Sequence, residues 1–240
     1  MAMRFYGSTD LDYVGCGQPS HLDLDPQTDF TLSCWVQTEN NVGYGTFIGK
    51  AGATTASRQY QLTYGSPGPP YELQAVIGGT FYASGAKGAD GAWHHCGLIN
   101  FDNAGTQNFR MYLDGVAVGV NAVSGSATNT ADLLLGARRG DDSNGGASFV
   151  MRGTLADIRI YNRALAAPEM LTIFNQRGRD NIVEGLVGRW LMNEESPGTA
   201  ASGAGIVKDL STYGTHGTPS DAPDYAEDVI TFKRRRAFGN

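Results

Sequence analysis

The segment Gly153-Thr-Leu-Ala-Asp-Ile-Arg-Ile-Tyr-Asn-Arg-Ala-Leu165 decides the fold class of this chain. It predicts the end of a β-strand that is followed directly by a short helix. Pro168 suits the first turn of that helix, and Gly178 suits the position just after its end. One face of the helix is apolar and is expected to pack on the strands. The members of this face are Met170, Ile173 and Phe174.

Strand signals with turn residues between them recur along most of the chain. In the segment 30–37, Phe30, Leu32, Cys34 and Val36 alternate with more polar neighbours, which predicts a strand with one apolar face. Gly78-Gly79 and Asp114-Gly115 are hairpin turns in this interpretation, because Gly and Asp accept the positive φ angles of such turns. The pattern is typical of an all-β sandwich.

The length and net charge of the chain limit the number of domains and the kinds of partner that we expect. The chain has 240 residues, which is enough for one large sandwich and short for two domains. Its net charge of −6 gives no overall positive field for nucleic acid. The N-terminus has no apolar signal-peptide core, and no run is long enough to span a membrane. We therefore expect synthesis in a reducing cytoplasm, with exit by lysis, phage assembly or an unconventional route.

Three cysteines, Cys16, Cys34 and Cys96, follow no spacing typical of a zinc site or a disulfide framework. Cys34 and Cys96 lie within apolar strand patterns, so we expect both to be buried free thiols. A separate basic run near the C-terminus is either a solvated tail or a docking site for an acidic partner surface. It consists of Lys233, Arg234, Arg235 and Arg236.

Four segments together resemble one known family. They are Phe30-Thr-Leu-Ser-Cys-Trp-Val36, Trp93-His-His-Cys96, Met111-Tyr-Leu-Asp-Gly-Val116 and the segment that begins at Gly153. Their combination is similar to the laminin-G-like modules of the concanavalin A-like lectin and glucanase superfamily, which also occur on phage virion proteins. The resemblance implies an all-β, concanavalin A-like jelly-roll sandwich of two antiparallel sheets with one short packed helix. It also implies a single domain over residues 1–240.

The C-terminal part departs from the order usual in this family. Residues 185–240 contain a block with the turn Asp209-Leu-Ser-Thr-Tyr-Gly, which usually opens such domains. A circular permutation explains this order, because jelly-roll termini often lie close together. A remnant of a second repeat is the alternative. We favour permutation, with 185–240 completing the sandwich, either within one chain or by strand exchange between subunits.

Catalysis is not expected. Retaining glycosidases of this fold carry the pattern Glu-x-Asp-x-x-Glu on one strand, and the sequence lacks it. Glu194 and Glu195 are consecutive, so on a strand they would point to opposite faces. The same argument separates His94 from His95: we expect one to hydrogen-bond within the sandwich and the other to face solvent.

Two kinds of binding site are predicted. The polar loop after Arg138 is a candidate sugar site, and its proposed ligand-binding residues are Arg139, Asp141, Asp142 and Asn144. Tyr44, Tyr64 and Tyr71 are candidates for stacking on a sugar ring. Calcium is the only cofactor considered, with Asp157 and Asp209 as ligands. Asp141 and Asp142, together with Asn144, are further candidates for the same ion. Asp209 has an alternative role, which is to cap its own turn.

The leading hypothesis is a non-enzymatic surface protein of a phage virion, either a capsid decoration protein or an adhesin. Its expected partners are capsid or other virion proteins, cell-surface glycans and further copies of the same chain. We expect it to bind neither nucleic acid nor a membrane. The expected location is the virion, after assembly in the host cytoplasm. A free carbohydrate-binding lectin is the alternative, and a degenerate glycosidase is a weaker one.

Overall fold

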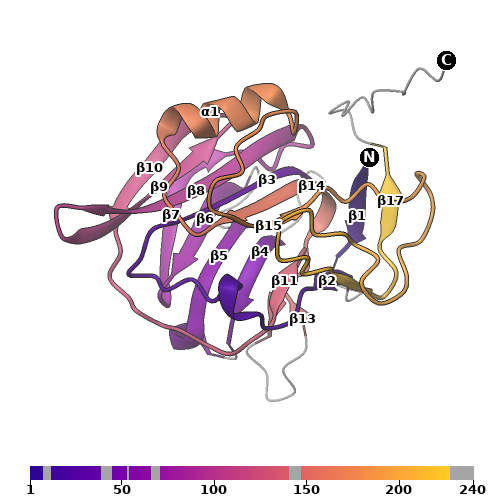
Figure 1. Cartoon of the computed structure of the whole chain (residues 1–240), viewed down its shortest axis with the longest axis horizontal. Coiled ribbons are helices and arrows are strands. Elements are labelled where there is room, and N and C mark those ends of the chain that lie inside the picture. The colour runs from indigo at the N-terminus through magenta and orange to yellow at the C-terminus, as the bar shows by residue number, and fades with distance from the viewer. Residues whose placement is uncertain (8–11, 39–44, 53, 66–70, 141–146, 228–240) are drawn as a thin grey trace.

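Two antiparallel sheets lie face to face and enclose the core of the molecule (Figure 1). The computed structural model describes residues 1–7, 12–38, 45–52, 54–65, 71–140 and 147–227. One α-helix lies outside the strand layers, and two short 3-10 helices occur in the connections. The predicted jelly-roll sandwich of two antiparallel sheets with one short helix is confirmed.

The first sheet has eight strands and includes the segment that begins at Gly153. Seven strands follow one another across the sheet, and the eighth, β15 (Leu186–Trp190), pairs with β14. In spatial order the seven are β10 (Val116–Ala122), β9 (Thr106–Leu113), β8 (Trp93–Asn103), β3 (Phe30–Thr38), β14 (Arg152–Tyr161), β1 (Ala2–Tyr6) and β17 (Asp224–Ala226).

The second sheet has seven strands. In spatial order these are β16 (Thr218–Ser220), β2 (Tyr13–Gly15), β11 (Leu133–Leu135), β4 (Gly45–Ala51), β5 (Arg58–Gly65), β6 (Glu72–Ile77) and β7 (Thr80–Lys87). A separate two-stranded ribbon is formed by β12 (Arg138–Arg139) and β13 (Ala147–Ser148). The 3-10 helices are η1 (Ser20–Leu22) and η2 (Thr55–Ser57).

The core lies between the sheets because alternate residues of each strand point inward. Phe30, Leu32, Cys34 and Val36 all belong to this core and are fully buried, as the alternation in β3 predicts. The two predicted hairpin turns are also present. Asp114 and Gly115 both have positive φ, and so do both glycines between β6 and β7.

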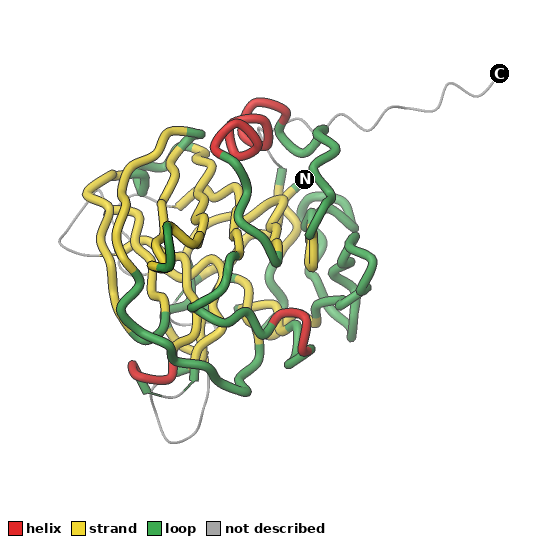
Figure 2. Tube along the Cα trace, turned by 60° about the vertical axis from the view of Figure 1, so that its left-hand side comes forward, coloured by secondary structure: helices red, strands yellow, loops and turns green. Residues whose placement is uncertain are grey.

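The helix α1 (Ala167–Gln176) covers the outer face of the eight-stranded sheet (Figure 2). Met170 and Ile173 are buried against side chains of this sheet, which include Ile99 and Tyr112. The helix ends at Arg177, which adopts a left-handed conformation. The predicted helix and its packing face are therefore confirmed.

The C-terminal third adds strands to both sheets of the same sandwich. β15 pairs with β14, β16 pairs with β2, and β17 pairs with β1, so the two ends of the described chain lie side by side (Figure 1). Trp190, in β15, is fully buried in the main core. Residues 186–226 thus pair within the chain, whereas the evolutionary origin of this order stays a hypothesis.

Cys16, Cys34 and Cys96 are buried free thiols, which confirms the prediction for the latter two. No helix in the described ranges has the length and hydropathy needed to cross a membrane.

Candidate functional site

A groove lies on the outer face of the seven-stranded sheet. We call it the sheet groove. It has a volume of about 310 Å³, which is at the small end of the range for ligand sites in proteins. Polar and aromatic side chains line it together. They are Arg58, Gln61, Thr63, Val76, Phe81, Arg138 and Phe149.

The floor of the sheet groove comes from the alternation of β5. Tyr60, Leu62 and Tyr64 point into the core, so Gln61 and Thr63 point outward. Both outward residues are almost fully buried at the base of the groove. The strand therefore places an amide and a hydroxyl, instead of apolar groups, beneath the groove.

Gln61 is anchored through only one end of its amide. Its Nε2 donates a hydrogen bond to Thr46 Oγ1 at 2.9 Å, whereas its Oε1 is buried and accepts no hydrogen bond from any residue that the structure describes. A buried acceptor of this kind costs about 1–3 kcal/mol when it stays unpaired. A donor that enters the groove, such as a hydroxyl group, would relieve this cost.

Two phenylalanines stand at the walls of the sheet groove. Phe81, on β7, is 47% exposed, and Phe149, which follows β13, is 41% exposed. The guanidinium of Arg138 lies 3.9 Å from the centre of the Phe149 ring, and its Nη1 donates to the Arg139 carbonyl oxygen at 2.7 Å. Exposed aromatic faces beside hydrogen-bonding groups are a combination that suits sugar rings.

The sugar loop predicted from the sequence begins and ends at this groove. Asp141, Asp142 and Asn144 lie outside the described residues. Arg139 is half-buried on β12, and its Nε has no hydrogen-bond partner among the described residues. Arg138 and Phe149, which flank the loop, both line the groove. Arg139, the one predicted ligand-binding residue within the described ranges, does not itself line the groove.

The predicted stacking tyrosines differ from the observed aromatic walls. The prediction that Tyr64 stacks on a sugar ring was wrong. Its side chain points into the core and is 1% exposed, and its hydroxyl lies 3.2 Å from Cys96 Sγ. Tyr71 is half-buried and packs against the core, whereas Tyr44 lies outside the described residues. The signal that could have found Gln61 is the alternation of β5. No local pattern marks Phe149, because its position depends on the turn of the chain beyond β13.

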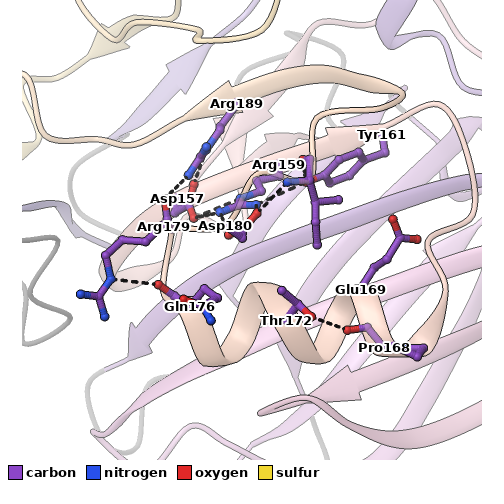
Figure 3. Close-up of polar contacts among 12 residues, drawn as sticks. Asp157, Arg159, Tyr161, Pro168, Glu169, Thr172, Gln176, Arg179, Asp180 and Arg189 are labelled. Atoms are coloured by element: carbon purple, nitrogen blue, oxygen red, sulfur yellow. Dashed lines mark hydrogen bonds and ion pairs between the residues drawn. The ribbon is translucent and has the colours of Figure 1, made fainter.

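Asp157 occupies a buried ionic cluster between β14 and the segment after α1 (Figure 3). Its Oδ2 accepts hydrogen bonds from Arg159, at 2.6 Å and 3.0 Å, and its Oδ1 accepts one from Arg189 at 2.8 Å. Arg159 also forms two bonds with Asp180. Burial alone would raise the pKa of Asp157, but the two guanidinium groups outweigh it and lower the pKa.

The backbone of β14 places Asp157 in this position. The register with β3 shifts between Ala156 and Arg159, and Asp157 has a φ of +44°. Such a bulge lets consecutive residues point to the same face of a sheet. Ala156 and Arg159 both lie on the outer face, while Ile158 stays in the core.

Asp209 organises its own turn. Its Oδ1 accepts hydrogen bonds from the backbone N–H groups of Arg189 and Ser211, and its Oδ2 accepts bonds from Ser211 and Thr215. These contacts match the capping role that was the alternative for this residue. Asp157 and Asp209 both contact Arg189, through its side chain and its backbone respectively.

The carboxylates of Asp157 and Asp209 fit these structural roles better than calcium ligation, because every oxygen of both already accepts a hydrogen bond. Within the described ranges, no group of three or more His, Cys, Asp or Glu is placed to hold a metal ion. Calcium binding stays a prediction that only a titration can test.

The adjacent histidines have contrasting surroundings. His94 lies between two carboxylates, 2.7 Å from Asp114 and 3.1 Å from Asp90. His95 is fully buried beneath α1, and neither ring nitrogen has a hydrogen-bond partner among the described residues. The expectation that one histidine faces solvent was therefore wrong, since His94 is half-buried and His95 is fully buried.

Comparison with known proteins settles the family. A model of the laminin-G-like branch of the concanavalin A-like lectin/glucanases superfamily matches residues 12–170, about two thirds of the chain. The chain belongs to this superfamily. Among curated proteins, no sequence matches this concanavalin A-like domain.

Solved structures of other proteins share the fold. One is a putative carbohydrate binding protein from Bacteroides ovatus, with 18% identity and a TM-score of 0.68; the alignment covers 95% of this chain and 60% of that one. Another is a heptameric SAP-like pentraxin from Limulus polyphemus, with 14% identity and a TM-score of 0.54. That alignment covers 72% of this chain and 81% of the pentraxin chain. The concanavalin A-like domain therefore spans less than two thirds of the Bacteroides protein.

Glycosidase chemistry would need two carboxyl groups that face one bound sugar. The described residues that line the sheet groove of this concanavalin A-like domain include neither Asp nor Glu. The basic run Lys233, Arg234, Arg235 and Arg236 lies outside the described residues.

Proposed function

We propose that this domain is a non-catalytic carbohydrate-binding module whose sugar site is the sheet groove. The buried, unpaired Oε1 of Gln61 carries this proposal, because it offers an acceptor to a sugar hydroxyl. Phe81 and Phe149 add exposed rings for the apolar face of a pyranose. The family and the Bacteroides structure support the proposal at the level of the fold.

Isothermal titration after a glycan-array screen tests the sugar site. We expect Gln61→Ala and Phe81→Ala each to weaken binding about tenfold, which corresponds to about 1.4 kcal/mol. Leu210→Ala is the matched control, since Leu210 is also an exposed apolar residue, at 55%, and does not line the groove. Binding that neither groove variant weakens, or an array without any bound glycan, would refute the assignment.

The absence of catalysis is part of the same proposal and needs its own assay. Each glycan that binds is incubated with the protein, and released reducing ends are measured. We expect no release above the buffer control, because the described groove lining offers no carboxylate as general acid or nucleophile. Release that Gln61→Ala abolishes would favour the degenerate-glycosidase alternative.

For the biological setting we keep the phage virion hypothesis, as capsid decoration or adhesion, with a free lectin as the alternative. Its support is the resemblance to virion modules and the basic run Lys233–Arg236. Deletion of residues 233–240 should abolish association with particles while glycan binding persists. Unchanged association would remove the docking role of this run.

A further inference from the structure

A second pocket lies on the outer face of the eight-stranded sheet, beside the start of α1. We call it the helix pocket, and its volume of about 350 Å³ suits one small ligand. It shares no lining residue with the sheet groove, which lies on the other sheet. It is lined by Ile99 and Phe101 from β8, by Arg110 and Tyr112 from β9, and by residues 164–167, which lead into α1.

The pairing of β8 with β9 builds the floor of the helix pocket. Ile99 lies opposite Arg110 in the ladder, so both point to the outer face of the sheet. Phe101, two residues further along β8, points the same way. Leu98 and Met111 point in the opposite direction and belong to the core. The alternation that fills the core therefore leaves an apolar strip with one arginine at the start of α1.

The guanidinium of Arg110 has no acidic partner. It lies 5.4 Å from the centre of the Phe101 ring, and the side chain forms neither an ion pair nor a hydrogen bond with any residue that the structure describes. A guanidinium presents five N–H donors in a planar fork that matches a carboxylate. Its position at the wall of an apolar pocket therefore favours a ligand that brings an anionic group.

Tyr112 supplies a second donor to the same pocket. This residue is only 2% exposed, and its hydroxyl has no hydrogen-bond partner within the described ranges. A buried hydroxyl that stays unpaired is unfavourable, so an acceptor that enters the pocket stabilises it. Tyr112 lies two residues after Arg110 on β9 and therefore on the same face of the sheet. One bound carboxylate can thus meet donors from both residues.

The charges around the start of α1 also favour an anion. The first turn of a helix carries the positive end of the helix dipole. Its carboxylate, Glu169, is held by Arg163 through bonds of 2.6 Å and 2.9 Å, and it accepts a third bond from the Ala166 N–H at 2.8 Å. Arg163 therefore balances the charge of Glu169. The described lining of the helix pocket contains neither Asp nor Glu, so Arg110 is left without a counter-charge there.

We propose that the helix pocket binds a small amphipathic carboxylate, a molecule with an aromatic or aliphatic body and one carboxylate group. The body contacts Ile99, Phe101 and Leu165, while the carboxylate accepts hydrogen bonds from Arg110 and Tyr112. A doubly charged phosphate fits this pocket less well, because the lining is mainly apolar and offers one cation. This second site does not depend on sugar binding in the sheet groove.

An NMR titration of ¹⁵N-labelled protein with 3-phenylpropionate, an aromatic monocarboxylate, tests the site. We expect saturable shifts of the N–H signals of residues 164–167 and of the neighbouring parts of β8 and β9, with a dissociation constant in the millimolar range for so small a ligand. The alcohol 3-phenylpropanol, which lacks the carboxylate, should bind about tenfold more weakly. Arg110→Gln should weaken binding of the acid by a similar factor, and Tyr112→Phe by about threefold.

Arg179→Gln is the matched control, since Arg179 is an exposed arginine beyond the other end of α1 and does not line the pocket. It should bind the acid like the wild type. Tyr112→Phe keeps the packed ring and removes only the hydroxyl, so it separates ligand binding from folding. The absence of saturable shifts at tens of millimolar, equal binding of acid and alcohol, or unchanged binding by Arg110→Gln would overturn the proposal. Glycan binding by Arg110→Gln should equal that of the wild type, which separates this test from that of the sheet groove.

Discussion

Replacement of His95 by phenylalanine should make the domain markedly less sensitive to acid. His95 lies beneath α1, with its ring centre 5.2 Å from that of Trp35 and 6.2 Å from that of Phe174. Burial, and secondarily the positive charge of Arg159, lower its pKa from 6.5 to about 4. A phenyl ring fills the same space without a group that takes up a proton.

The size of the effect follows from the two pKa values. In the unfolded chain His95 takes up a proton below about pH 6.5, whereas in the folded protein it does so only below about pH 4. Its contribution to stability is therefore lost as the pH falls from 6.5 to 4. The difference between these values, at about 1.4 kcal/mol per pH unit, amounts to about 3 kcal/mol.

Urea unfolding at several pH values between 7 and 4, followed by tryptophan fluorescence, measures this difference. The free energy of unfolding of the wild type should fall relative to that of His95→Phe, by about 3 kcal/mol over the whole range. Groups that titrate elsewhere affect both proteins equally and cancel. Parallel pH profiles would show that His95 is accessible to water or already charged, and would refute the packing beneath α1.

Three further predictions concern other parts of the fold. Asp180→Asn should destabilise the protein by about 3 kcal/mol in thermal or urea unfolding, because it leaves the buried charge of Arg159 with one carboxylate fewer; an unchanged midpoint would contradict this. His94, whose pKa is raised by Asp114 and Asp90 despite burial, stabilises the fold below pH 6.5 and loses this contribution as the pH rises through its folded pKa. NMR titration of its ring should show a midpoint above 6.5, and a lower midpoint would be inconsistent with the two contacts. Gly153→Ala should cost more than about 2 kcal/mol, since a Cβ there would lie 2.1 Å from the Gln37 carbonyl oxygen; stability equal to the wild type would mean that β14 and β3 can separate locally.

The strands and turns were predictable because their causes are local. The alternation of Phe30, Leu32, Cys34 and Val36 defines the inner face of β3. Asp114-Gly115 forms its turn through the φ angles that these two residues accept. Each of these signals needs only a few neighbouring residues, so the sequence alone contains it.

The candidate site was less predictable because it depends on contacts between distant segments. The sheet groove joins β5, β6 and β7 to Arg138 on β12 and Phe149 after β13. The polar loop in the sequence indicated only one of these parts. Asp157 was predicted as a calcium ligand because related sandwiches often use a carboxylate of this strand for calcium. Its actual partners are Arg159, Arg189 and, through Arg159, Asp180, which a bulge with positive φ brings together. Neither the bulge nor these partners have a local pattern.

The pairing of β1 with β14 and β17 has a consequence for synthesis on the ribosome. Met3 pairs with Leu155 on one side and with Tyr225 on the other. Strand β1 must therefore wait for partners that are translated far later, roughly ten seconds or more at the usual elongation rates. Until then its apolar face is open to chaperones and to other nascent chains. This domain should consequently complete its fold only after β17 has left the ribosome, at a rate limited by long-range strand pairing.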